Sequence, residues 1–187
     1  GVDKSSLLYA VSDTTDPNDG FSEMHSINIH EDSFAFPGTG FVYGESMRLG
    51  FNADAHVIAI SMHSIVAPEV VDHTNVISIN KSVVLDQDPI GTPLTAFATD
   101  LPNTHYAVVP AVMHASSPGD PMWLVSIDRA DNTAIQVTQL DDPATAPVVG
   151  ATTDVAVTIP FNEPTDASQP TGDVIDTGDT RVLSAAW

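Results

Sequence analysis

Apolar and polar residues alternate over short runs along most of this chain, and turn-forming Pro, Gly, Asn and Asp separate the runs. Such alternation is typical of β-strands with one buried face, because successive side chains of a strand point to opposite sides of the sheet. Helical periodicity is nearly absent. The pattern therefore predicts an all-β fold.

One pair of strands returns three times along the chain. The first strand of the pair covers residues 7–12, 57–62 and 122–127, and the second covers residues 25–30, 75–80 and 134–139. The pairs start 50 and 65 residues apart, a spacing that suits one small antiparallel sheet per repeat, as in the blades of a β-propeller. We therefore expect one propeller segment over residues 1–187, with repeat units of about 1–33, 34–104 and 105–178 and the start of a further unit at 179–187.

A third type of strand, rich in Pro, Gly and Ala, precedes the pair at residues 36–41 and 108–114 and returns at 179–187. Blades taper toward the propeller axis, so this strand is predicted to be the innermost one, with outer strands at 93–99 and 154–159. The chain then holds about three blades plus the first strand of another. Because propeller rings have four to eight blades, the remainder is expected from a longer polypeptide or from another chain.

The charge balance excludes some partners. There are 25 acidic side chains against five basic ones, for a formal net charge of −20. Such a chain repels nucleic-acid phosphates and anionic lipids, so neither is an expected partner, whereas cations or a basic protein fit better. No apolar run approaches the roughly 18 residues that span a bilayer, so membrane insertion is not expected. Two simpler explanations for the acidity are the need of turns for Asp and a salt-rich habitat.

Two features bear on the compartment. The chain contains no cysteine, which excludes disulfides, thiolate metal sites and thiol nucleophiles. It begins Gly1-Val2-Asp3-Lys4, with neither an initiator Met nor a signal peptide, which indicates a processed or excised chain. We expect a secreted or extracellular segment rather than a cytoplasmic one.

Five segments carry a resemblance to a known family, namely residues 10–17, 50–55, 79–81, 110–114 and 176–187. In this order they resemble large secreted bacterial proteins with repeated β-propeller blades, some of them loosely similar to sialidase-type propellers. The resemblance implies a propeller fold and an extracellular setting, and it supplies no catalytic residues. In such proteins the last segment continues into an Asn-Gly turn and a further Leu-Trp strand, so the resemblance implies a truncated repeat.

The loop between the first two strands is a candidate calcium site. Asp13, Asp16, Asn18 and Asp19 gather there, and calcium prefers several oxygen ligands on a flexible turn. The spacing does not match an EF-hand loop. A loop whose Asp side chains bond its own backbone, without any cation, is the favoured alternative.

Seven histidines raise the question of a transition metal. Ligands on one face of a strand lie two residues apart, and the sequence holds no His-x-His pair. Partly exposed strand histidines are therefore favoured over zinc or copper ligands. The seven are His25, His30, His56, His63, His73, His105 and His114.

A hydrolytic active site would need catalytic side chains that lie close together in the fold. A glycosidase needs two carboxylates about 5 to 10 Å apart. The sequence holds no Gly-x-Ser-x-Gly segment for a serine nucleophile. Aspartates near the loops of the predicted inner strands could converge on the axis, namely Asp54, Asp120, Asp173, Asp176 and Asp179.

Arg181 is one of only five basic residues and lies two positions from Asp179. Together they are the candidate ligand-binding residues, since an Arg on an inner strand could hold a carboxylate with both arms of its guanidinium group. A structural ion pair with Asp179 or Asp176 is the favoured alternative. Trp123 and Trp187 are interpreted as packing residues rather than as sugar platforms.

The leading functional hypothesis is a non-catalytic extracellular β-propeller segment that acts in binding or assembly, with another chain or a copy of itself, or a glycan, as partner. One alternative is a glycoside-hydrolase-like propeller with carboxylates on the axis. A third is an architectural subunit, in which residues 182–187 pair with the blade begun by residues 7–12 of another chain and so cover edges that would otherwise aggregate.

Overall fold

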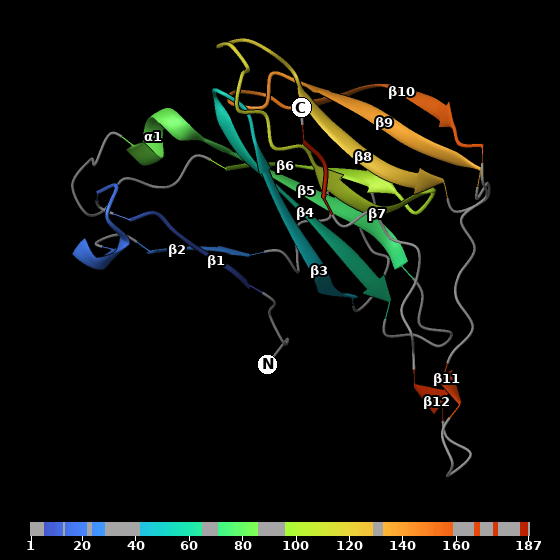
Figure 1. Cartoon of the computed structure of the whole chain (residues 1–187). Coiled ribbons are helices and arrows are strands. Elements are labelled where there is room, and N and C mark those ends of the chain that lie inside the picture. Colours follow the sequence, from blue (N-terminus) through green and yellow to red (C-terminus); the bar gives the residue numbers. More distant parts are fainter. Residues whose placement is uncertain are drawn as a thin grey trace.

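The computed structural model describes residues 6–12, 14–21, 24–28, 42–64, 71–85, 96–128, 133–158, 167–168, 174–175 and 184–186 (Figure 1). Over these residues the protein is all-β. Its strands are β1 Ser6–Ala10, β2 Met24–Asn28, β3 Val42–Phe51, β4 Ala55–Ser64, β5 Val71–Asn80, β6 Ala96–Pro102, β7 His105–Pro110, β8 Met122–Asp128, β9 Ala134–Asp141, β10 Val148–Ala156, β11 Ala167–Ser168 and β12 Val174–Ile175. A 3₁₀ turn, η1, covers Pro17–Asp19, and one short helix, α1, covers Lys81–Leu85.

The strands form two four-stranded and two two-stranded antiparallel sheets in the described part of the chain. The larger sheets have the orders β3-β4-β5-β6 and β7-β8-β9-β10, so each is a meander in which neighbours along the chain are neighbours in space. The smaller ones pair β1 with β2 and β11 with β12. The all-β prediction is confirmed.

The predicted strand pairs correspond to β1 with β2, β4 with β5 and β8 with β9, and the predicted outer strands overlap β6 and β10. The predicted inner strand at 108–114 overlaps β7, which pairs with β8. The strand beside β4 is β3, at Val42–Phe51, which the sequence did not predict. The inner strand predicted at 36–41 lies outside the described residues, and so do 179–183 and 187.

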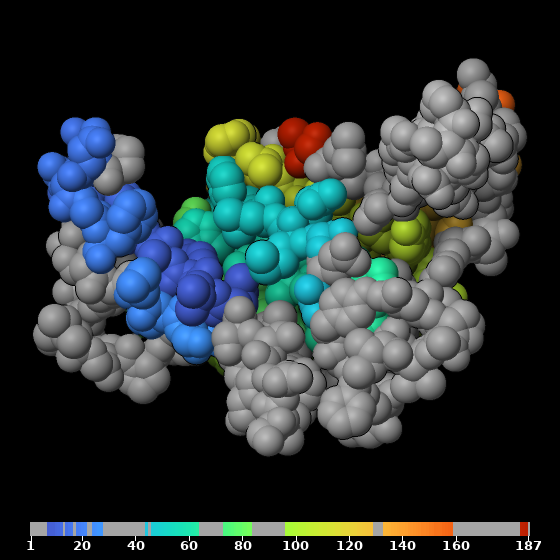
Figure 2. Space-filling view, turned by 90° about the horizontal axis from the view of Figure 1, so that it is seen from below, coloured from blue at the N-terminus to red at the C-terminus, as the bar shows by residue number. Residues whose placement is uncertain are grey.

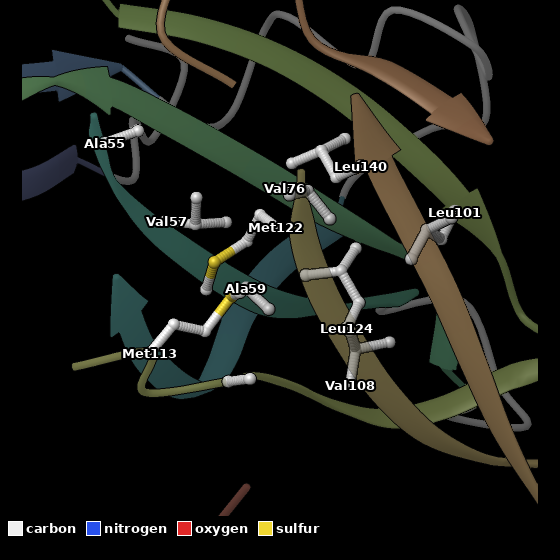
Figure 3. Packing of buried hydrophobic residues seen from close by; sticks show 11 residues of the cluster. Ala55, Val57, Ala59, Val76, Leu101, Val108, Met113, Met122, Leu124 and Leu140 are labelled. Carbon is white, nitrogen blue, oxygen red and sulfur yellow. The ribbon is translucent and has the colours of Figure 1, made fainter. Parts of the chain in front are cut away.

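The core lies on both faces of the sheet β3–β6. Alternating side chains of β4 make this possible, because Val57 and Ala59 point to one face while Ile58 and Ile60 point to the other. The first face packs against the sheet β7–β10 (Figure 3), and the second packs against Leu7 of β1. The protein is therefore layered, with β3–β6 between β1–β2 and β7–β10. Figure 2 shows the surface of β1–β2 beside that of β3.

The two large sheets are equivalent in detail. Each first strand carries a bulge with a non-glycine residue at positive φ, Ser46 at 55° and Ala107 at 52°. Ala107 follows Ser46 by 61 residues, and Val112 follows Phe51 by the same number. Phe51 and Val112 lie side by side. Bulges re-aim a strand and increase its twist, so both strands are redirected at the same place. The sheets are thus two copies of one structural unit.

This equivalence corrects the alignment of the repeated pairs. Phe51 pairs with His56, and extension of the Pro110–Leu124 pair places Val112 opposite Met122. His56 therefore corresponds to Met122, whereas the sequence aligned Val57 with Met122. A slip of one residue exchanges the two faces of a strand, so the correction decides which side chains of β8 point outward.

The layers are also tied by hydrogen bonds. The Ser78 hydroxyl donates to the carbonyl of Pro143, and Asn80 Nδ2 donates to the carbonyl of Ala144 at 3.0 Å. Both donors belong to β5, and both acceptors lie in the connection between β9 and β10. A buried carbonyl that loses its partner costs about 1–3 kcal/mol. The two bonds therefore hold the connection between β9 and β10 against the end of β5.

Candidate functional site

Three segments of the chain meet edge to edge at one place, which we call the inner-strand junction: Phe51 at the end of β3, residues 111–113 just after β7, and residues 185–186. Phe51 bridges Val112 in parallel, and Val112 bridges Ala186 in parallel. The Phe51 N–H donates to the Ala111 carbonyl at 3.1 Å, and the Val112 N–H donates to the Ala185 carbonyl at 2.9 Å. Residues 185–186 thus lie beside Val112 as Val112 lies beside Phe51.

Gly50 allows the junction to close. A Cβ atom at this position would lie 2.4 Å from the Pro110 carbonyl oxygen and 2.5 Å from that of Ala111. Both contacts are with backbone atoms, which cannot move aside as a side chain would. Only a residue without a side chain fits this close approach, although the sequence placed the strand rich in small residues at 36–41 rather than at Gly50.

The buried Asn52 side chain organises the loops at the junction. Its Oδ1 accepts the N–H groups of Asp54 and Ala55 at 3.0 and 2.9 Å, and its Nδ2 donates to the Asp120 carbonyl at 2.8 Å. One side chain thus holds the turn between β3 and β4 and joins it to the connection that leads into β8. Asp54 adds a second link, because its Oδ2 accepts the Gly119 N–H at 2.6 Å.

A cluster of aromatic and basic side chains surrounds Phe51, and we call it the Phe51 cluster (Tyr9, Phe51, His56, Lys81 and His114). The ring centroids of His56 and His114 lie 6.4 and 5.2 Å from that of Phe51, and both contacts are edge-on. The Lys81 ammonium lies 5.0 Å from the Phe51 ring centroid and donates to the Asn52 carbonyl at 2.9 Å. All members are half-buried except the exposed His114.

Burial sets the protonation of two members of the cluster. It raises the pKa of Tyr9 to about 12, so the phenol keeps its proton, and its oxygen is hydrogen-bonded to His56 Nδ1 at 2.5 Å. Burial, and secondly the charge of Lys81, lower the pKa of His56 below 6.5. His56 is then a neutral imidazole at neutral pH, with its proton on one ring nitrogen. In the tautomer in which the phenol donates to Nδ1, that proton resides on Nε2.

Buried polar groups also lie within the large sheets. On β5 and β6, Asn75 Nδ2 donates to Asp100 Oδ1 at 2.8 Å, and His73 Nε2 lies 3.9 Å from the same oxygen. On β7 and β8, His105 Nδ1 lies 3.3 Å from the Ser126 hydroxyl. Burial lowers the pKa of His105, and the charges of Asp128 and Asp154 oppose that shift. The expectation of partly exposed histidines is wrong for His73 and His105, which are buried.

The candidate calcium ligands lie in an exposed loop. Asp16 Oδ1 accepts both the backbone N–H and the side-chain amide of Asn18, at 2.9 and 2.8 Å, and Asp19 Oδ2 accepts the Thr14 hydroxyl at 2.7 Å. These are the local bonds expected of a loop that stabilises itself. Asp13 lies outside the described residues.

No group of three or more His, Asp or Glu side chains within the described residues is arranged to hold a metal ion. Of the aspartates expected to converge, Asp54 and Asp120 do lie in touching loops, but their carboxylates accept the backbone N–H groups of Gly119 and Ser117. Asp173, Asp176, Asp179 and Arg181 lie outside the described residues, as do His30 and Trp187. Trp123 packs against the core, as expected.

The sequence did not single out Phe51, Lys81 or Asn52. Asn52 followed by Asp54 is a turn signal that indicates a loop and nothing more. No sequence pattern predicts the contact between Tyr9 and His56, which are 47 positions apart.

In the part of the chain that the structure describes, no helix is both long and apolar enough to cross a membrane. Comparison of the chain with protein-family models, with curated proteins and with solved structures finds no match.

Proposed function

We propose that this chain is a β-propeller segment that acts outside the cell, without catalysis, in binding or assembly, and that its partner in assembly is a second copy of itself. The observation that carries the proposal is the parallel series of Phe51, Val112 and Ala186 at the inner-strand junction. The innermost strands of successive propeller blades run side by side around an axis, and four-stranded meanders stacked face to face are the usual blades.

The series of Phe51, Val112 and Ala186 favours a further sheet that packs on the sheet β7–β10. Residues 184–186 occupy the inner-strand position of the next unit, beside the outward face of that sheet. Val125 of β8, with Ile135 and Val137 of β9, lies on this face and is half-buried. These side chains alternate with Leu124 and Leu140, which face β3–β6. An apolar sheet face of this kind favours a second sheet as its neighbour.

The opposite end of the stack supplies a matching surface. Leu8 of β1 and Met24 of β2 point away from β3–β6 and are 74% and 77% exposed. Within the described residues, β1 pairs on one edge alone, with β2. A second copy can therefore place its β1–β2 layer on the outward face of β7–β10, with its β1 beside residues 184–186. Two copies would supply about six sheets, within the four to eight blades of a propeller.

Sedimentation velocity tests the assembly. The wild-type chain is expected to form a dimer, or a larger closed species, whose population rises with protein concentration in buffer with about 0.15 M salt, where repulsion between the acidic chains is screened. Leu8→Glu is expected to shift the population to monomer, because the exchange places a charge in the contact without touching the core of its own chain.

Ser82→Glu is the matched control, since Ser82 is exposed on α1 and the exchange adds the same charge. It is expected to assemble as the wild type does. A wild-type chain that sediments as a monomer at all concentrations would refute the assembly, and so would equal weakening by both variants, which would indicate general repulsion rather than a contact at Leu8.

A further inference from the structure

Lys81 is an unusual residue in a chain with 25 acidic and five basic side chains. Its ammonium lies at the inner-strand junction, where its partners are the Asn52 carbonyl and the ring of Phe51. No carboxylate of the described residues forms an ion pair with it. A carbonyl uses one of the three ammonium protons. A half-buried positive charge thus keeps donors available for an external acceptor.

A second donor lies at the same place. Tyr9 is hydrogen-bonded to Nδ1 of His56, so Nε2 is the ring nitrogen left for a ligand, and it carries the N–H when the phenol donates to Nδ1. Within the described residues, no hydrogen bond forms at Nε2. Both groups border the same apolar ring, since the Phe51 centroid lies 5.0 Å from Lys81 Nζ and 6.4 Å from the His56 centroid. The Phe51 cluster thus combines an ammonium group, an imidazole nitrogen and an aromatic wall.

We propose that the Phe51 cluster is a binding site for a small monocarboxylate with an aromatic or aliphatic body. The carboxylate accepts hydrogen bonds from Lys81 Nζ and His56 Nε2, and the apolar body lies against Phe51. A single ammonium matches a single negative charge. A dianion would face the repulsion of a chain with a net charge of −20 and only one nearby compensating charge. This inference does not depend on the assembly proposed above.

Calorimetric titration with benzoate tests the site, alongside NMR of the His56 ring protons. The wild-type chain is expected to bind benzoate saturably and to shift the His56 signals. Lys81→Gln is expected to weaken binding at least about tenfold, because it removes the ammonium that pairs with the carboxylate but keeps a polar side chain. Arg48→Gln is the matched control. It removes the same charge from β3, where Arg48 bonds the Met47 carbonyl, and is expected to bind benzoate as the wild type does.

Three outcomes would overturn the proposal. They are the absence of saturable binding to the wild type, equal loss in both variants, and binding of inorganic phosphate as tight as that of benzoate at the same ionic strength. The His56 signals are read on the wild-type chain, so the proposal stays open to refutation even if Lys81→Gln does not fold. A monomeric chain that binds benzoate would refute the assembly alone.

Discussion

At the scale of single residues, burial rather than sequence position decides what the histidines do. Alternation along the strands predicts which side chains share a face, but not what covers that face. His56 is half-buried under Tyr9, whereas His73 and His105 are buried in the large sheets. All three lie within the first three residues of a strand. Their environments differ because the covering residues come from distant parts of the chain, and so the sequence could not separate them.

The pair Lys81 and His56 gives a prediction on pH. Burial is the larger cause of the lowered pKa of His56 and the charge of Lys81 is the second, so Lys81→Gln is expected to raise the pKa of His56 partway toward its ordinary value of 6.5. NMR titration of the histidine ring protons measures this. His105, whose pKa burial also lowers, should titrate unchanged in the variant and serves as the internal control.

The sign of the linked stability follows from the lowered pKa. As pH falls below 6.5, the unfolded chain takes up the proton before folded His56 does. The stability that neutral His56 contributes is fully present above about pH 6.5 and is lost as pH falls through the lowered folded pKa. A wild-type His56 that titrates at or above 6.5 would contradict this account of the cluster.

At the scale of elements, regular alternation was enough to find β1, β2, β4, β5, β8 and β9, whereas the bulged strand β3 was missed. β3 carries a bulge between Glu45 and Arg48, which breaks the alternation halfway along the strand. The rule that small residues mark the inner strand pointed instead to residues 36–41. The helix α1 has five residues, too few to show a helical period. The bulge that redirects β3 also interrupts its alternation of apolar and polar residues, and so the sequence pattern does not predict the strand that leads to the junction.

The candidate site shows the same limit. The sequence expected Asp54 and Asp120 to approach one another, and their loops do touch through Asn52 and Gly119. It did not predict that these carboxylates bond backbone N–H groups, nor that Lys81 lies over Phe51. Of these contacts, the bond from Gly119 to Asp54 joins the two large sheets and so accompanies the parallel approach of Phe51 and Val112, which are 61 positions apart.

Gly50→Ala tests the close approach at the junction. The added methyl group would meet two backbone carbonyls at 2.4 and 2.5 Å, so β3 and β7 must separate. We expect a loss of about 1–3 kcal/mol in the free energy of unfolding, which is typical of overpacking, measured by urea denaturation.

Gly150→Ala is the control for Gly50→Ala, because its added methyl group would meet Asp141 Oδ2 at 3.1 Å and Gln139 at 3.3 Å, where the nearest atom ends a side chain that can rotate. It is expected to cost clearly less. Equal losses in the two variants would show that Gly50 is not a point of backbone contact.

At the scale of the whole molecule, three layers share one strongly acidic surface. Sheets that stack through Val57, Val76 and Leu124 supply the burial, while a net charge of −20 favours expansion of the chain. The assembly proposed above would bring further negative charge together, so self-repulsion opposes both folding and association. Salt is therefore expected to stabilise the fold and the assembly alike.

Thermal unfolding in increasing sodium chloride tests this balance, and a gradual rise of Tm is expected as the screening length falls from about 30 Å at 0.01 M to about 10 Å at 0.1 M.

Calcium and magnesium chloride at equal ionic strength should raise Tm by the same amount, because Asp16 and Asp19 already bond their own loop. A rise in Tm that occurs with calcium but not with magnesium at equal ionic strength would instead favour a cation site at Asp13, Asp16 and Asp19. A ligand that binds the folded state stabilises it by RT ln(1 + [L]/Kd), whereas screening acts alike for both divalent ions. If Tm falls or stays constant in sodium chloride, the acidic surface does not limit stability, and the salt dependence expected of the assembly loses its basis.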